Sequence, residues 1–434
     1  MRRKIPIYYL FLIIFCGSCV TVFSLWSVRQ VFLGDNRLGT LGDVMLSIAA
    51  FPSLAKQVVL DITGIGSGQV IKDRFPLLDG FNKFGKLQAG TREDRGYLLL
   101  SSYDNIKKQS TAKLIRIRDY HILKEWQPDI DSILFRVKSK FIKSNAGIGH
   151  PFLLKDGGLV FSLDSVIKIG PTSSVEWIAD CMSHHSLEID AVGNIWVCSR
   201  MKPSSYEGVL SNLDDAIAKI SPSGKVLLKK SVAKILYENG YRGLLAAGFR
   251  GTHDEDPIHL NEVQPALSDS KYWKKGDLML SMRHLSTIAL YRPSTGKVIW
   301  LKTGPWMNQH NVEFVSDHEI SVFGNNVISD LKGDVLMEGH NNVYLYDFAN
   351  DTISTPWEKA MSTLDVRTLT GGRSKVLLGR DVFIQECNYG RLLRLTPQTA
   401  KWEFVQRVDK NHLSLLSWSR YMTEEEVRHI FPNL

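Results

Sequence analysis

Three histidines occupy the same position in three copies of one repeated segment. His185 opens the copy HSLEIDAVGNIWVCSR, and His310 opens the copy HNVEFVSDHEISVFGN. His259 opens a third copy, HLNE, in which nine extra residues around SDSKYWKKG precede LMLSMR. A glutamate follows each histidine by three residues, at Glu188, Glu262 and Glu313. Equivalent positions of successive repeats lie close in space, so the sequence predicts that the three imidazoles converge.

Asn261 and Arg283 accompany His259 in the third copy. Asn261 lies two residues after His259, on the same face of an extended strand, and Arg283 lies near the end of the next strand. Imidazole, amide and guanidinium groups together suit a tetrahedral oxyanion such as sulfate or phosphate. A neutral histidine is also a nucleophile, so this set is suited to group transfer through a covalent enzyme intermediate.

Other interpretations of the same residues remain open. Three histidines can also bind zinc, but Arg283 would repel a cation and no acidic ligand is obvious, so we predict no metal and no cofactor. The recurring glutamates would then only brace each unit through hydrogen bonds. In a regular strand His184 and His185 point to opposite faces, and a β-bulge would exchange them.

The elements that must position these residues are short strands. From about residue 96 onward, six units of roughly 30–55 residues each supply four antiparallel strands. Their second hairpins are clearest at 216–230, 288–300, 343–357 and 392–404. This pattern predicts an all-β fold, a six-bladed β-propeller whose inner strands line a central channel. A pair of β-sandwiches is the alternative, but it does not predict in-register recurrence.

The N-terminal part of the chain differs from the repeats. We expect a membrane anchor at 1–29, a connecting segment at 30–95 with helical spacing at 41–59, the catalytic propeller at 96–410 and a C-terminal segment at 411–434. The apolar run from Ile5 to Val28 is long enough to cross about 30 Å of hydrocarbon. The basic residues at 2–4 should stay cytoplasmic, which places the propeller of a single-pass protein on the periplasmic or extracellular side. A cleaved signal peptide is the alternative.

Composition excludes several classes of protein. The chain has 434 residues, with 53 Lys and Arg against 45 Asp and Glu, and ordinary shares of glycine and proline, so collagen-like and low-complexity chains are excluded. Its net charge of +8 is spread along the sequence, without the basic run typical of a nucleic-acid-binding arm. Five cysteines do not form a disulfide scaffold.

Four segments resemble the motifs of the arylsulfotransferase family. They are HHSLEIDAVGNIWV, DPIHLNEVQPAL, GDLMLSMRHLSTIALYRPSTGKVIWLKTG and NQHNVEFVSDHEISVFGNN, and the resemblance covers roughly residues 140–400. It implies a six-bladed propeller that moves a sulfuryl group between phenols without the nucleotide donor PAPS. It implies that His310 is the nucleophile that becomes transiently sulfated. It also implies that four further residues hold the sulfate group and stabilise its transition state: His185, His259, Asn261 and Arg283.

The resulting expectation is a membrane-anchored, PAPS-independent sulfotransferase. Its partners would be an aryl sulfate donor and a phenolic or other hydroxyl acceptor, together with the membrane and no nucleic acid. Two alternatives remain, a metal-dependent propeller hydrolase and a non-enzymatic envelope propeller that binds an anionic ligand. Aromatic residues that could line a phenol site are Tyr291, Trp300, Trp306 and Trp357.

Overall fold

The structure is a computed structural model of the chain, which divides into two compact units. One unit comprises residues 1–67 and 248–254, and the other comprises residues 68–247 and 255–434. The structure describes residues 7–32, 38–42, 44–45, 48, 70–83, 86–87, 89–104, 107–139, 146–201, 213–246, 256–330, 333–337 and 339–432. The helical stretch expected at 41–59 lies largely outside these residues.

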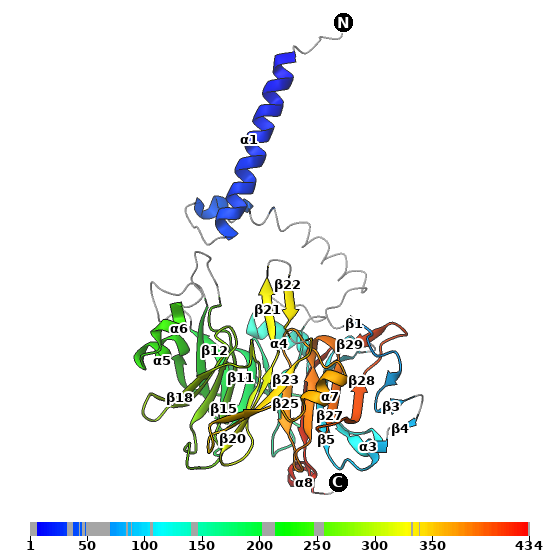
Figure 1. The fold of residues 1–434 in the computed structure, drawn as a ribbon. Coiled ribbons are helices and arrows are strands. Elements are labelled where there is room, and N and C mark those ends of the chain that lie inside the picture. Colours follow the sequence, from blue (N-terminus) through cyan, green and yellow to red (C-terminus); the bar gives the residue numbers. More distant parts are fainter. Residues whose placement is uncertain are drawn as a thin grey trace. The chain divides into compact units, whose positions relative to one another are not determined.

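The first unit contains one long apolar helix, α1 (Ile7–Phe32), shown in blue in Figure 1. Within it, Ile7–Gln30 is long and apolar enough to cross a membrane, and its side chains are largely exposed. Length and composition fit a signal sequence and an anchor equally. The chain therefore has an N-terminal apolar helix of one of these two kinds.

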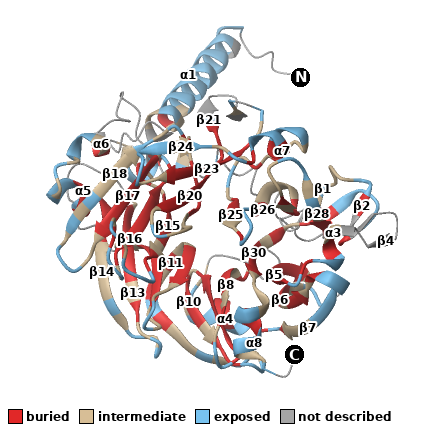
Figure 2. Cartoon of the chain, turned by 60° about the horizontal axis from the view of Figure 1, so that its bottom comes forward, coloured by how far each residue is buried: buried red, intermediate tan, exposed pale blue. Residues whose placement is uncertain are grey.

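The second unit is a mainly-β propeller. Figure 2 shows its sheets arranged around a common centre, with buried residues concentrated along the strands. Four of its sheets have four antiparallel strands each. The strands of the first sheet are, in order, β15 (Leu260–Pro265), β16 (Leu278–Met282), β17 (Thr287–Arg292) and β18 (Lys297–Thr303), and those of the second are β19 (Val312–Phe314), β20 (Glu319–Gly324), β23 (Asn342–Asp347) and β24 (Thr352–Ser354). The third sheet contains β25 (Arg373–Val376), β26 (Val382–Glu386), β27 (Arg391–Leu395) and β28 (Ala400–Val405). The fourth contains β30 (Leu416–Met422), β5 (Tyr97–Asp104), β6 (Gln109–Arg116) and β7 (His121–Trp126). The predicted all-β propeller is thus confirmed, with four separate blades.

The remaining large sheet has seven strands. They are β8 (Gly149–Leu153), β9 (Leu159–Leu163), β10 (Ser165–Ile169), β11 (Val175–Ile189), β12 (Ile195–Met201), β13 (Asp214–Ile220) and β14 (Val226–Ser231). The long strand β11 is shared: its residues 175–182 pair with β10, and its residues 183–189 pair with β12. The predicted count of six blades stays a prediction, because this sheet is continuous across β11.

The two ends of the propeller unit meet in one sheet. Strand β30 pairs with β5, so Tyr97 lies opposite Met422 although the two residues are far apart in sequence. Strand β30 lies within residues 411–434, which the sequence predicts to be a separate C-terminal segment, whereas in the structure it is a strand of the same sheet as β5, β6 and β7. The end of the chain thereby closes the ring of sheets.

Apolar side chains fill the spaces between neighbouring sheets. Met279 and Ile288 of one sheet, for example, share a buried cluster with Val322 and Tyr344 of the next. Because successive residues of a strand point to opposite faces, each sheet buries apolar side chains on both faces. This packing fixes the inner strands relative to one another and gives the centre of the ring a rigid wall.

Shorter elements accompany these sheets. They are the pair β1 (Val70–Lys72) and β29 (His412–Ser414), the sheet β2 (Leu78–Asp79), β3 (Asn82–Lys83) and β4 (Lys86–Leu87), the hairpin β21 (Val327–Asp330) and β22 (Gly333–Leu336), and helices α3 (Ala89–Arg92), α4 (Ile130–Val137), α5 (Val232–Glu238), α6 (Arg242–Ala246), α7 (Glu358–Thr363) and α8 (Glu424–Ile430). The described residues within 70–95 belong to the propeller unit. Arg407 donates to the carbonyls of Phe75 and Leu78, and Arg394 forms an ion pair with Asp94.

Candidate active site

Irregular backbone in or just before three inner strands directs histidines toward the cavity. His150, His185 and His259 have left-handed φ angles of 48°, 51° and 51°. The strand register shifts at or next to each of them. Residues other than glycine seldom adopt this conformation, so its recurrence indicates a functional constraint. The shift in β11 brings His185, not His184, to the cavity wall.

A cavity of about 310 Å³ lies among the ends of these strands. Its lining residues are His150, His185, His259, Asn261, Glu262, Arg283, His310, Asn311, Thr370, Gly371, Gly372 and Trp418. The structure therefore brings together all five residues that the sequence analysis selected. The ring centroid of His185 lies 4.8 Å from that of His259 and 5.9 Å from that of His310.

His310 is buried and is held at both ring nitrogens. Its Nδ1 lies 3.0 Å from Asn325 Oδ1, and the Gly371 N–H donates to its Nε2 at 3.1 Å. The amide oxygen can only accept, so the proton lies on Nδ1 and the lone pair on Nε2. Burial, helped by the positive charge of Arg283, lowers the pKa of His310 to about 3. His310 is therefore a neutral imidazole at ordinary pH.

The preceding residue, His184, fixes the same tautomer in His185. His184 Nε2 lies 3.0 Å from the Ser199 carbonyl and donates to it, which leaves His184 Nδ1 as an acceptor. His185 Nδ1 lies 2.8 Å from that atom and donates to it, so the His185 lone pair is on Nε2. Burial, and then the neighbouring imidazoles of His184 and His259, hold the pKa of His185 well below its ordinary range.

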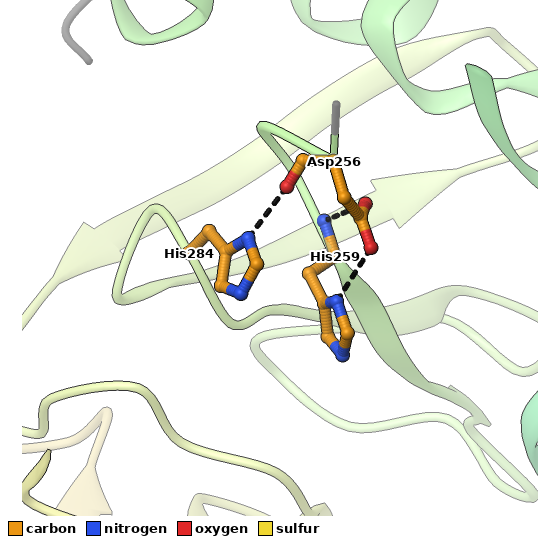
Figure 3. Close-up of side chains that lie close together, drawn as sticks. All are labelled: Asp256, His259 and His284. Carbon is orange, nitrogen blue, oxygen red and sulfur yellow. Dashed lines mark hydrogen bonds and ion pairs between the residues drawn. The ribbon is translucent and has the colours of Figure 1, made fainter. Parts of the chain in front are cut away.

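His259 is paired with a carboxylate, as Figure 3 shows. Its Nδ1 lies 2.6 Å from Asp256 Oδ2, and its backbone N–H donates to Asp256 Oδ1 at 3.2 Å. Burial opposes the ionisation of Asp256, but the hydrogen bond from His259 and the charges of His259, His284 and Arg200 together outweigh it, and the pKa of Asp256 lies below its ordinary value. The ionised carboxylate accepts the Nδ1–H, so the lone pair of His259 is also on Nε2.

Asp256, His259 and His284 are the one set of described side chains close enough to hold a metal ion together. His284 Nδ1 lies 2.5 Å from the Asp256 carbonyl, and its Nε2 lies 2.9 Å from Arg283 Nη1. The guanidinium of Arg200 lies 3.8 Å from Asp256 as well. Two positive charges beside the set oppose a bound cation, whereas they favour an anion.

Arg283 and Asn261 also line the cavity. Both are buried, and Arg283 also approaches the Leu369 carbonyl at 3.5 Å. The Asn261 amide donates to the Gln309 carbonyl at 3.3 Å. Gln309 is fixed in turn by donating to Ser281 Oγ at 3.2 Å. A guanidinium held in this way faces an oxyanion without reorganising.

Charged residues form a second layer beneath the cavity. Arg373 donates to Glu313 at 2.9 Å and to Glu188 at 3.4 Å, and Arg420 forms an ion pair with Glu188 at 2.8 Å. Two of the glutamates that follow a histidine by three residues, Glu188 and Glu313, are thus linked to arginines of other inner strands. Arg373 and Arg420 carry no repeated sequence signal, because the cavity residues next to them in sequence are Gly372, just before β25, and Trp418 of β30 instead of histidines.

A comparison with protein families identifies the chain. The model of the arylsulfotransferase (ASST) family matches residues 153–407, which is more than half of the sequence. The chain belongs to the arylsulfotransferase family. The predicted family resemblance is therefore confirmed, and family membership suggests a sulfotransferase that acts on aryl sulfates. No curated protein matches the chain in sequence.

Solved structures similar to this arylsulfotransferase family member are distant. A protein of unknown function from Bacteroides caccae is 13% identical, with a TM-score of 0.46 and coverage of 76% of this chain and 99% of that chain. The periplasmic gluconolactonase of Pseudomonas aeruginosa is 11% identical, with a TM-score of 0.40 and coverage of 76% and 99%. Virginiamycin B lyase of Staphylococcus aureus is 11% identical, with a TM-score of 0.38 and coverage of 70% and 82%. Similarity at this level carries no information on activity.

The structure adds cavity residues that sequence reasoning missed. His150 lies over Trp418, with ring centroids 3.7 Å apart, and both line the cavity. The repeat copy that begins at His150 is a signal that could have revealed this histidine. The four aromatic residues expected near a phenol lie elsewhere, because they pack in clusters between blades: Tyr291, Trp300, Trp306 and Trp357.

Proposed function

We propose that this protein is a PAPS-independent sulfotransferase. It moves a sulfuryl group from an aryl sulfate to a phenolic or other hydroxyl acceptor through a sulfohistidine at His310. The observation that carries the proposal is the buried, neutral His310, whose Nε2 lone pair lies in a cavity beside Arg283. Membership of the arylsulfotransferase family supports the same chemistry.

The first half-reaction transfers the sulfuryl group to the protein. The Nε2 lone pair of His310 forms a bond to sulfur, the ester S–O bond breaks, and its electron pair leaves on the aryl oxygen. The Gly371 N–H donates to the same lone pair, so this hydrogen bond breaks before attack. Negative charge on the sulfuryl oxygens is stabilised by the Arg283 guanidinium and the Asn261 amide.

The second half-reaction transfers the group to the acceptor. The acceptor oxygen bonds to sulfur, the N–S bond breaks, and its electron pair returns to His310 Nε2. His259 is suited to remove the acceptor proton, because Asp256 fixes its Nδ1–H and stabilises the positive charge that it gains. A protonated His259 can return that proton to a leaving phenolate in the next cycle.

The proposal extends to the predicted architecture. We infer six blades, because the two parts of β11 pair with separate strand sets and six apolar clusters of described residues join neighbouring sets. We also infer that the apolar N-terminal helix is retained as a single-pass anchor, with the propeller on the periplasmic or extracellular side. The basic residues that precede this helix support that orientation.

The test uses the full-length protein in detergent with 4-nitrophenyl sulfate, with and without phenol. We expect phenol-dependent release of nitrophenolate and, without acceptor, an adduct of about 80 Da on the intact protein. His310→Ala should lose both signals. His412→Ala is the matched control, because His412 is an exposed histidine of β29 that pairs with Asp409 away from the cavity.

Transfer or adduct formation in His310→Ala would remove His310 from the nucleophile role. A metal-dependent hydrolase would instead release nitrophenolate without acceptor, form no adduct and lose activity on chelation. The Asp256, His259 and His284 set is the feature that favours this second candidate. Metal analysis of the purified protein therefore accompanies the assay.

A further inference from the structure

Three side chains form a line that leads from the cavity to a carboxylate in the interior. His185 lines the cavity, and its Nδ1 lies 2.8 Å from His184 Nδ1. His184 Nε2 in turn lies 3.0 Å from the Ser199 carbonyl and 3.4 Å from Asp215 Oδ1. Asp215 is buried, and its Oδ2 accepts the Leu260 N–H at 2.6 Å, which fixes the carboxylate. Each imidazole of this line can therefore pass a proton to the next group.

The charges at the inner end of this line leave room for one proton. The Arg200 guanidinium lies 3.5 Å from Asp215 and 3.8 Å from Asp256, so one cation serves two carboxylates. A buried carboxylate stabilises a positive charge on an imidazole beside it, as Asp215 would on His184. Burial, and then the neighbouring imidazoles, hold the pKa of His185 well below its ordinary range, so a positive charge is more stable on His184 than in the cavity.

We propose that His185 protonates the leaving aryl oxygen, and that His184 and Asp215 are positioning residues that form a proton relay with it. The inference rests on the proposed function, because it takes the substrate to be an aryl sulfate. In the loaded relay, His184 carries a proton on both nitrogens beside Asp215, and His185 carries its proton on Nε2. The loaded relay therefore holds one proton more than the arrangement described above.

Discharge of the relay balances the first half-reaction. As the S–O bond breaks, its electron pair on the aryl oxygen takes the proton of His185 Nε2, and the electron pair of that N–H bond stays on Nε2. The Nδ1 proton of His184 moves to His185 Nδ1. This step restores the neutral tautomers that the structure shows for both imidazoles. A proton that enters from solvent at His185 Nε2 reloads the relay by the reverse movements.

The position of His185 suits a proton donor to the leaving group. Its ring centroid lies 5.9 Å from that of His310, and an in-line displacement puts the leaving oxygen on the side of sulfur opposite the attacking nitrogen. The leaving oxygen then has a donor separate from His259, which we assign to the acceptor. The titratable and charged groups that face the relay are His150, Arg200, Asp215, His259 and His310. Burial lowers the pKa of His150 and His310, so neither of them supplies the proton.

The experiment compares two donors that differ in their need for a proton. Phenyl sulfate releases an oxygen about as basic as that of tyrosine, with a pKa of about 10, whereas 4-nitrophenolate is a much weaker base and leaves without a proton. Single-turnover release of phenol or nitrophenolate is measured without acceptor, on the full-length protein in detergent. Asp215→Asn keeps an oxygen for the Leu260 N–H but removes the charge. It should slow release from phenyl sulfate about 10²-fold and change release from 4-nitrophenyl sulfate little.

Asp214→Asn is the matched control. It makes the same change at the preceding residue of β13, which is also buried and accepts a hydrogen bond from Ser231, on the opposite face of the strand. The ratio of the two release rates should stay at its wild-type value. If Asp215→Asn does not fold, His184→Gln replaces it. Glutamine can accept from His185 but cannot carry a proton, so the same selective loss is expected.

A merely structural role for Asp215 or His184 would slow both donors alike, and that result would overturn the inference. So would an unchanged rate with phenyl sulfate in Asp215→Asn, which would leave His259 as the donor. Failure of the proposed function looks different. In that case the wild type releases neither phenol nor nitrophenolate and forms no adduct at His310. Transfer with an unchanged ratio between the donors would retain the transferase and reject the relay.

Discussion

Replacing Asn325 tests how the protein fixes the reactive nitrogen of His310. Asn325 Oδ1 lies 3.0 Å from His310 Nδ1, and Asn325 Nδ2 donates to the carbonyls of Thr368 at 3.0 Å and Gly371 at 2.8 Å. These two donor bonds determine which end of the amide faces the imidazole. Asn325 therefore holds the tautomer with a lone pair on Nε2, the atom that we propose attacks sulfur.

Asn325→Ala removes the acceptor of the Nδ1–H, so only the Gly371 N–H, which donates to Nε2, still favours the reactive tautomer. A neutral hydrogen bond contributes about 1 kcal/mol net, and a difference of about 1.4 kcal/mol is roughly tenfold in a ratio of states. Only one tautomer can attack, and about 1 kcal/mol is roughly fivefold, so kcat/KM should fall by up to about fivefold where it does not depend on pH. Asn325→Asp keeps an acceptor and should lose less.

The acid side of the pH profile gives a second, independent readout. Burial, and then Arg283, lower the pKa of His310 to about 3, whereas the hydrogen bond to Asn325 raises it. Protonation of His310 should therefore reduce the wild-type rate only near pH 3. Asn325→Ala removes a contribution that raises the pKa, so this loss should move to lower pH. Asn325→Asp adds a negative charge, so the loss should move to higher pH.

The assay is kcat/KM for 4-nitrophenyl sulfate from about pH 2 to about pH 9, a range that covers both the acid loss and the plateau and distinguishes a neutral nucleophile from a titrating one. Asn194→Ala is the control, because Asn194 contacts Asp190 in a turn outside the cavity. An unchanged plateau in Asn325→Ala would refute the tautomer argument. A wild-type rate that follows an ordinary histidine pKa would refute the neutral, buried His310.

Two further predictions address the charged groups. Arg283→Ala should lower kcat/KM by about 10²–10³-fold, because it removes a preorganised donor to the transition state; an unchanged value would exclude Arg283 from that role. Arg420→Met should lower the free energy of unfolding by about 3–5 kcal/mol in denaturant titration, because the buried Glu188 loses a cation at 2.8 Å. The double variant Glu188→Gln/Arg420→Met should recover much of the lost free energy of unfolding. If the double variant and Arg420→Met lose equally, the cause is lost packing of Arg420 and not the unpaired charge.

The sequence could predict that the three histidines lie together, because they occupy the same position in successive repeats. Residues that share a position in successive units meet at the axis, and His185, His259 and His310 do line one cavity. The choice between His184 and His185 could not be made, because it depends on a register shift that strand alternation does not encode. The structure supplies that shift, together with a left-handed backbone at His185.

The repeats could not predict the position of β30, the strand that completes the ring of sheets. Strand β30 carries Trp418 where neighbouring inner strands carry histidine, so no repeated residue marks it. Its pairing with β5 joins distant parts of the chain, and only the completed ring brings them together. Arg420, which lies on the same strand, was missed for the same reason.

The partners of the histidines explain why sequence motifs do not extend into the second layer of the site. Each of three imidazoles gives its Nδ1–H to an outward acceptor, but the acceptors are an imidazole, a carboxylate and an amide: His184, Asp256 and Asn325. All three leave the Nε2 lone pair toward the cavity. The chemistry therefore constrains where the proton lies and leaves the type of acceptor free. A repeat in the sequence can reveal the histidines that react, whereas the residues that orient them emerge only from their contacts.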